Sequence, residues 1–203
     1  MQASFSASLE RLGLSYVDLY LIHSPFRASS PERLQKVWAE LEAIQASGRA
    51  RSIGVSNFSV ANLKTILTTA RVTPAVNQIE YHPYLQHTPD GLIDFCREKN
   101  IAVVAYGPLT AVTKASPGPC DDLYKELSKK YGVFGADIAL RWCIDQGIVV
   151  VTTSANEQRL QGYMNRVPAF KLTPKEVERI AEEGLKKHFR GFWTDFFAAD
   201  DRR

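Results

Sequence analysis

The chain has 203 residues, of which 45% are hydrophobic and 23% are charged, and its formal net charge is +3. These values are typical of a globular protein with one or two domains, and the charge is too small to indicate a nucleic-acid partner. No apolar run approaches the roughly 18 residues of a transmembrane helix, and the N-terminus lacks the apolar core of a signal peptide. Three scattered cysteines predict neither disulfides nor a metal site. We therefore expect a cytoplasmic protein with no membrane partner.

Strands and helices alternate along the chain. Apolar, β-branched runs predict the strands, and apolar residues at helical spacing, with Pro or Ser at the start or Gly at the end, predict the helices. In chain order the prediction is the end of a helix over 6–12, a strand over 16–22, a helix over 31–47, a strand over 51–55, a helix over 60–70, a strand over 75–79, a helix over 91–99, a strand over 101–106, helices over 120–131 and 136–146, a strand over 148–152, and helices over 156–163 and 174–188.

This alternation favours an α/β fold. Strands that are apolar on both faces are typical of a parallel sheet covered by helices. No G-x-G-x-x-G segment follows a strand, which argues against a dinucleotide fold of the Rossmann type and leaves a (β/α)8 barrel as the better interpretation. Such barrels have eight strands and about 250 residues. With five predicted strands, we expect the first three βα units to be missing.

Several motifs occur in a fixed order. They are Ser8–Leu14 with Tyr16–His23, then Gly54–Phe58, Asn77–Pro83, Val104–Leu109 and Val150–Ser154. This set resembles strands four to eight of the aldo-keto reductases, with the helix that leads into strand four, and it covers essentially the whole chain. The Thr-Thr-Ser segment and the tail around Phe192 and Trp193 resemble fungal members. The resemblance implies that residues 1–203 are the C-terminal part of an NADP-dependent oxidoreductase domain of TIM-barrel type.

The resemblance also implies a reaction, the NADPH-dependent reduction of a small aldehyde or ketone by hydride transfer, with NADH as an alternative cofactor. In the family a Tyr protonates the substrate with help from a Lys and an Asp, and a His orients the carbonyl. Only the His is present, as His23. Neither Tyr20, inside a strand, nor Tyr106 is a suitable replacement for the acid. We expect this chain alone to be inactive.

The cofactor residues implied by the resemblance lie at strand ends. Ser56, Asn57 and Gln78 would hold a carboxamide, Tyr106 would stack on the nicotinamide, Gly107 and Leu109 would contact the pyrophosphate, and Thr153, Ser154 and Arg159 would bind the adenosine phosphate. Thr153 stands where the family usually has a Lys, so the preference for NADPH over NADH stays open. Without the resemblance, a structural histidine, a turn cap and a core amide would explain His23, Asn57 and Gln78 better.

Other features stay open or argue against alternatives. Ser24 stands where many animal members have a Trp, which leaves the substrate undefined. His82 and His87 do not have the spacing of a helical metal pair. The aromatic tail, Phe189 to Phe197, would line a substrate mouth or pack across the barrel. A non-catalytic nucleotide-binding or interaction protein is the alternative function. The family is expected to be monomeric, whereas an open sheet edge along residues 16–22 predicts association of this chain.

Overall fold

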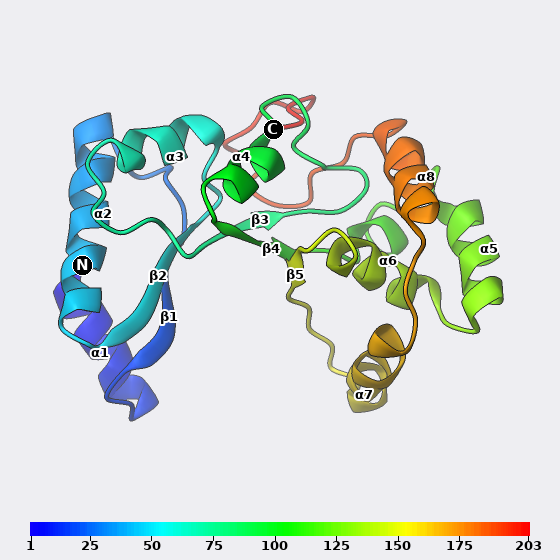
Figure 1. The fold of residues 1–203 in the computed structure, drawn as a ribbon, viewed down its shortest axis with the longest axis horizontal. Helices are drawn as coiled ribbons and strands as arrows, with labels where there is room; N and C mark the ends of the chain where they lie inside the picture. The colour runs from blue at the N-terminus through cyan, green and yellow to red at the C-terminus, as the bar shows by residue number, and fades with distance from the viewer. The chain divides into compact units, whose positions relative to one another are not determined.

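The computed structural model describes residues 1–203, which form two compact units. The first unit holds residues 1–78 and 90–102, and the second holds residues 79–89 and 103–203. Figure 1 shows the alternation of strands and helices in chain order. No helix combines the length and the apolar composition needed to cross a membrane.

The observed elements follow the predicted order. They are α1 Gln2–Leu12, β1 Val17–Ile22, α2 Pro31–Ala46, β2 Ala50–Ser56, α3 Val60–Leu67, β3 Val76–Glu80, α4 Leu92–Glu98, β4 Ala102–Tyr106, the short 3-10 helix η1 Thr110–Val112, α5 Asp121–Tyr131, α6 Gly135–Ile144, β5 Val149–Val150, α7 Glu157–Arg166, η2 Val167–Ala169 and α8 Pro174–Leu185.

In the first unit, β1, β2 and β3 form parallel pairs, with Tyr20 opposite Ile53 and Val55 opposite Asn77. Helices α2 and α3 pack side by side (Figure 1). The core between helices and sheet is fully closed, because Trp38 and Ile53 are 0% and 1% exposed. Burial of this much apolar surface is the main stabilising contribution to the unit.

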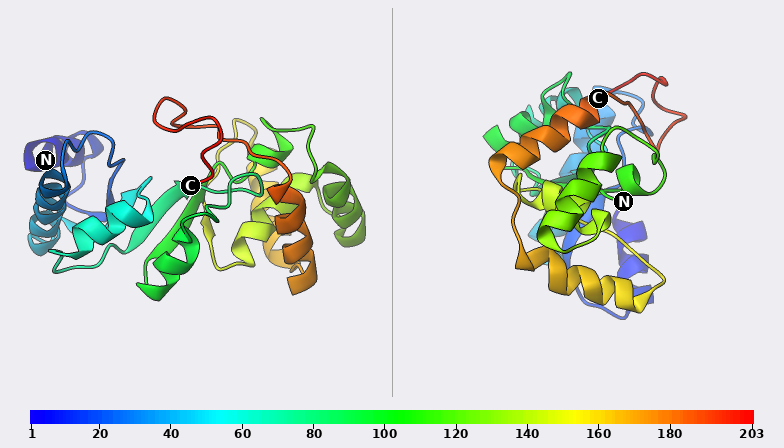
Figure 2. Two further views of the ribbon diagram at one scale, coloured as in Figure 1. Left: turned by 90° about the horizontal axis from the view of Figure 1, so that it is seen from above. Right: turned by 90° about the vertical axis from the view of Figure 1, so that its right-hand side faces the viewer.

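In the second unit, β4 pairs with β5 in parallel, with Val104 opposite Val149. Helices α5, α6 and α8 lie next to one another (Figure 2). The Trp142 ring of α6 is fully buried and stacks on Tyr81 at 5.2 Å, while its indole N–H donates to the carbonyl of Val177 in α8 at 3.0 Å. The indole therefore fixes α8 against α6.

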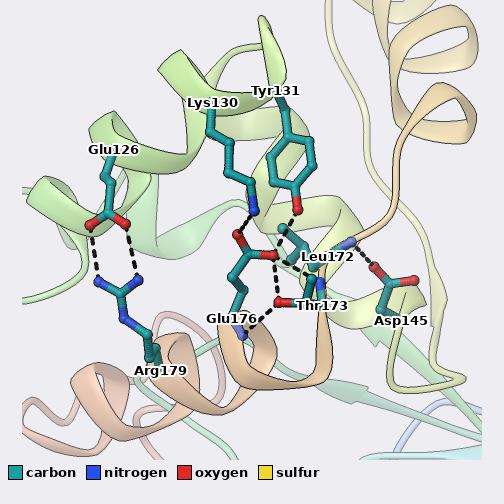
Figure 3. A network of polar contacts seen from close by, with 8 residues as sticks. All are labelled: Glu126, Lys130, Tyr131, Asp145, Leu172, Thr173, Glu176 and Arg179. Carbon is teal, nitrogen blue, oxygen red and sulfur yellow. Dashed lines mark hydrogen bonds and ion pairs between the residues drawn. The ribbon is translucent and has the colours of Figure 1, made fainter.

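The start of α8 carries a polar network around the buried Glu176 carboxylate (Figure 3). Thr173 and Glu176 form a capping box, in which each side chain bonds the other's backbone N–H. The Glu176 carboxylate also accepts from Lys130 at 2.6 Å and from the Tyr131 hydroxyl at 2.7 Å. Burial alone would raise the pKa of Glu176, but these donors lower it to about 2. The network thus joins α5 to the start of α8.

Several sequence predictions differ from the structure. Helix α3 ends at Leu67 and not at 70, α7 continues to Arg166 instead of ending at 163, and α8 ends at Leu185 and not at 188. The last strand spans Val149–Val150 and not 148–152, because Thr152 and Thr153 leave the ladder to line a cavity. The strand β1 is not buried on both faces: Leu19 is 41% exposed, since β1 pairs with β2 on one edge only within its unit. The two 3-10 turns, η1 and η2, were not predicted, because such short turns leave no periodic pattern.

Candidate cofactor site

The carboxyl ends of β2 and β3 bring three of the predicted residues together in the first unit. Ser56 Oγ donates to the backbone carbonyl of Gln78 at 2.7 Å, and the Asn57 backbone N–H donates to the same carbonyl at 2.9 Å. The Asn57 side-chain amide donates to Ser56 Oγ at 3.1 Å and to the carbonyl of His23 at 2.9 Å. We call His23, Ser56, Asn57 and Gln78 the strand-end cluster.

Asn57 takes a left-handed backbone conformation, with φ of 62°. Asn tolerates this region better than other non-glycine residues, and its short amide reaches the neighbouring strand end. The next residue, Phe58, is 1% exposed and is held by buried Asn77, whose amide donates to the Phe58 carbonyl at 2.9 Å. The turn after β2 is therefore fixed on both sides.

The other two members of the cluster present their side chains differently. His23 directly follows β1 and is exposed at the end of the strand. The side-chain amide of Gln78 makes no hydrogen bond within the chain. An amide provides both a donor and an acceptor, so Gln78 can pair with a ligand carboxamide without losing a protein contact.

A cavity of about 490 Å³ lies in the second unit, and we call it the Tyr106 cavity. Of the predicted residues it brings together Tyr106, Gly107, Leu109 and Thr153. It is also lined by residues that the sequence did not single out as cofactor contacts, namely Pro108, Thr110, Thr113, Lys114, Val151, Thr152 and Phe192. The wall thus combines threonine hydroxyls, one cation and aromatic rings.

Tyr106 ends β4, and its ring meets the Phe192 ring edge to face at 5.2 Å and 88°. Burial and the charge of Glu80 raise the pKa of Tyr106 well above its ordinary value. The next residue, Gly107, has a φ of 63°, and a Cβ there would lie 3.2 Å from Phe192 and from Thr110 Oγ1. Glycine therefore keeps the cavity open beside Tyr106.

Ser154 and Arg159 are not among the residues that line the Tyr106 cavity. Arg159 lines a separate cavity of about 320 Å³ at the start of α7, beside Asn156, Tyr163 and Arg166. The Asn156 side chain caps α7 by accepting from the Arg159 backbone N–H at 2.9 Å, and Ser154 Oγ accepts from the Asn156 N–H at 3.1 Å. Arg166 is paired with Asp137 at 2.7 Å, whereas the Arg159 guanidinium has no partner. The Arg159 guanidinium can therefore bind an anion.

The tail that walls the Tyr106 cavity is held by a buried carboxylate. Glu80 accepts from the backbone N–H of Gly191 at 2.8 Å and of Phe192 at 3.2 Å. It also pairs with His82 Nε2 at 3.0 Å, both side chains being 0% exposed. His87 donates through Nε2 to the Glu80 carbonyl at 2.8 Å, and burial lowers its pKa to about 4. Both histidines therefore form hydrogen bonds with Glu80, His82 with its carboxylate and His87 with its backbone carbonyl.

The sequence profile of the aldo/keto reductase family matches residues 1–183. The chain belongs to this family. It is 41% identical over 197 residues to an NADPH-dependent alpha-keto amide reductase of Saccharomyces cerevisiae, covering 94% of this chain and 63% of that one. It is 34% identical to an NAD/NADP-dependent indole-3-acetaldehyde reductase of Schizosaccharomyces pombe, covering 93% and 66%. The chain thus spans about two thirds of the length of these curated relatives.

Solved structures agree with this membership. An aldo-keto reductase from a Medee basin deep-sea metagenome library superimposes with a TM-score of 0.82 at 31% identity, over 93% of this chain and 66% of that chain. The Bombyx mori aldo-keto reductase in complex with NADP superimposes with a TM-score of 0.79 at 33% identity, over 89% of this chain and 61% of that chain. The fold is therefore the α/β fold with a parallel sheet that this family shares.

Two residues of this chain stand out only in the structure. Lys114 lies in an irregular Gly- and Pro-rich stretch, where its charge has no sequence context that would set it apart from a solvated lysine. Glu80 is the last residue of β3 and lies in the Asn77–Pro83 motif, but the backbone N–H groups from which it accepts lie 111 and 112 residues away in the tail. A charged residue at the end of a strand was the one available signal for Glu80.

Proposed function

We propose that this chain is the cofactor-binding part of an NADPH-dependent reductase of small aldehydes or ketones. The observation that carries the proposal is the Tyr106 cavity, which offers an aromatic floor, hydroxyl groups and a cation at a strand end. A dinucleotide presents a flat ring and a pyrophosphate, and these groups match such a wall. The names of the two yeast relatives, both reductases that use NADP cofactors, support the same conclusion.

The polar groups of the strand-end cluster match the carboxamide of the cofactor. Gln78 has an amide without a protein partner, and Ser56 Oγ, which donates to a backbone carbonyl and accepts from the Asn57 amide, keeps one lone pair to accept a further hydrogen bond. A carboxamide needs one donor and one or two acceptors. Ser56, Asn57 and Gln78 would therefore hold the nicotinamide carboxamide, while Thr153, Ser154 and Arg159 would hold the adenosine phosphate.

His23 is proposed as the residue that orients the substrate. NADPH supplies the hydride when bound, and negative charge then develops on the substrate oxygen. An imidazole N–H of His23, at the end of β1, would donate to this oxygen. Holding the carbonyl in this way lowers the barrier, but it does not provide the proton that the alcohol product requires.

These 203 residues lack a suitable proton donor, and we therefore propose that they bind the cofactor without turnover. A tyrosine acid needs a lowered pKa, whereas burial raises the pKa of both Tyr20 and Tyr106. We propose that β1 to β5 are strands four to eight of a (β/α)8 barrel in the cytoplasm, and that the Tyr, Lys and Asp belong to the three βα units before them. The share of the relatives' length that the chain covers, 63% and 66%, supports this arrangement.

Two measurements test the proposal. Fluorescence titration of the 203-residue chain should give a micromolar Kd for NADPH, and absorbance at the NADPH band should show no oxidation with small aldehydes or alpha-keto amides. A chain extended by the upstream coding sequence should oxidise NADPH with the same substrates. Absence of binding by both chains would sink the proposal.

A non-catalytic nucleotide-binding protein remains the second candidate, and the raised pKa values of Tyr20 and Tyr106 favour it. The intact mass of the native protein from its own cells separates the two. A mass above 22.7 kDa, by the equivalent of about three βα units, supports the reductase. A mass of 22.7 kDa supports binding without catalysis, and association through the exposed edge of β1 would then be tested by light scattering.

A further inference from the structure

Lys114 is the only charged residue among those that line the Tyr106 cavity. Its ammonium lies 4.0 Å from the centre of the Phe192 ring, in a cation–π contact. It forms no ion pair and no hydrogen bond within the chain. A cation beside a cavity with no carboxylate in its wall favours an anionic ligand.

The position of this ammonium is set from outside the cavity. The ring beneath it belongs to Phe192, whose backbone N–H is bound by the Glu80 carboxylate at 3.2 Å. The Lys114 stem runs beside Gly191, where a Cβ would lie 3.7 Å from Lys114 Cδ. Because Glu80 also binds the Gly191 N–H, the surface that supports Lys114 is held at two consecutive residues. Less side-chain freedom is then lost when an anion binds.

The neighbours of Lys114 indicate which anion it meets. Gly107 and Leu109, the expected pyrophosphate contacts, line the same cavity, and the side-chain hydroxyls of Thr110, Thr152 and Thr153 make no hydrogen bond within the chain. Arg159 lines the other cavity, at the start of α7. Thr153 stands where a family Lys is expected, so the Tyr106 cavity has no second cation.

We propose that Lys114 binds the pyrophosphate of the nicotinamide dinucleotide and supplies charge to this cavity from a loop instead of from position 153. The proposal rests on the proposed cofactor function. The pyrophosphate is common to NADPH and NADH, so Lys114 contributes equally to the affinity for both. Arg159, in contrast, contributes to the affinity for the extra phosphate of NADPH.

The test compares the Kd of NADPH and of NADH, by fluorescence titration at two salt concentrations, in five chains: wild type, Lys114→Met, Lys114→Arg, Lys129→Met and Arg159→Met. Lys129 is the matched control, since it is exposed on α5, has no partner and lines neither cavity. Thermal unfolding of each chain checks that it is folded.

We expect Lys114→Met to weaken both cofactors by the same factor, about fivefold at low salt and less at high salt. Lys114→Arg should stay within about twofold of the wild type because the charge is kept. Arg159→Met should weaken NADPH more than NADH. If Lys114→Met matches Lys129→Met, or weakens NADPH alone, Lys114 does not bind the pyrophosphate. If the wild type binds neither cofactor while it remains folded, the proposed function itself fails.

Discussion

The strand-end cluster and the Tyr106 cavity both include residues at strand ends, yet they use their polar groups in opposite ways. In the strand-end cluster, Ser56 and Asn57 donate hydrogen bonds to backbone carbonyls, and only the Gln78 amide makes no hydrogen bond within the chain. In the Tyr106 cavity, Lys114 and Thr153 have no polar partner within the chain. The geometry of the cavity wall is fixed instead by the tail, whose Gly191 and Phe192 N–H groups bind Glu80.

This difference separates two ways of preparing a binding site. The cluster is organised by its own bonds, so altering one member changes the geometry of the others. The cavity is organised by a buried carboxylate behind its wall, so its exposed lining residues Lys114 and Thr153 can be exchanged with little effect on the fold. Stability changes should therefore be large for the cluster and for Glu80, and small for these two lining residues.

The largest effect is expected from Gly54→Ala in β2. The new Cβ would lie 2.7 Å from the Val76 carbonyl oxygen and 2.9 Å from Leu21 Cδ2, which forces the strands that carry the cluster apart. We expect a loss of about 3 to 4 kcal/mol in the free energy of unfolding, measured in urea. Gly135→Ala is the control, because its Cβ would meet nothing closer than 3.7 Å. Equal stability of the two variants would contradict the close packing of β2.

Glu80→Gln should disrupt the cavity from behind. The amide keeps the shape but presents N–H groups where the carboxylate accepts from Gly191, Phe192 and His82. Leaving such buried donors unpaired should reduce the free energy of unfolding by about 3 kcal/mol and speed protease cleavage within the tail. Glu182→Gln, which changes an exposed carboxylate without a partner, should alter neither quantity. Unchanged tail cleavage in Glu80→Gln would show that the tail is held elsewhere.

Two variants of Asn57 separate the stability contributed by its amide hydrogen bonds from the effect of its left-handed backbone conformation. Asn57→Ala removes the amide and places Ala at a φ of 62°, so it should cost about 2 kcal/mol, whereas Asn57→Gly keeps the backbone relaxed and should cost about 1 kcal/mol. Urea unfolding measures both. If Asn57→Gly equals the wild type, the amide bonds to His23 and Ser56 contribute nothing to stability.

Acid should affect the second unit through Glu176. Its pKa is about 2 in the folded chain and 4.5 ordinarily, so its stabilising effect is complete above pH 4.5 and is lost as the pH falls toward 2. Because the Lys130 partner is half exposed, we expect the free energy of unfolding to fall by between about 1 and 2 kcal/mol. Protection of the α8 amides from hydrogen exchange should fall with the pH. Protection of the β2 amides should not, because the strand-end cluster beside them contains no carboxyl group. Glu176→Gln should remove the pH-dependent difference.

Local patterns predicted most of the fold. The Pro31 start and the apolar spacing of α2 gave a helix that ends one residue before the expected limit, and Ser59 caps α3 as expected. The strands β2, β3 and β4 begin and end within about one residue of their predicted limits. Periodicity and caps act within a few residues, which is why the sequence alone determines them.

The candidate site was predictable only in part, because its geometry depends on contacts distant in sequence. The strand-end position of Ser56 and Asn57 follows from the strand pattern, but their bonds to His23 and Gln78 do not. Arg159 and Thr153 lie close together in sequence and still line different cavities. The position of the Lys114 ammonium depends on the Phe192 ring, whose backbone N–H is bound by Glu80.

The hold of Glu80 on two consecutive amides has a consequence for the length of the tail. Between the end of α8 at Leu185 and Gly191, the chain must have the length that brings this pair of N–H groups, and no other pair, to the carboxylate. The two bonds to Glu80 are made by the backbone, so they depend on the number of residues in this spacer and not on its side chains. Inserting or deleting one residue there would replace Phe192 at the cavity wall with a neighbour, so the spacing itself is constrained.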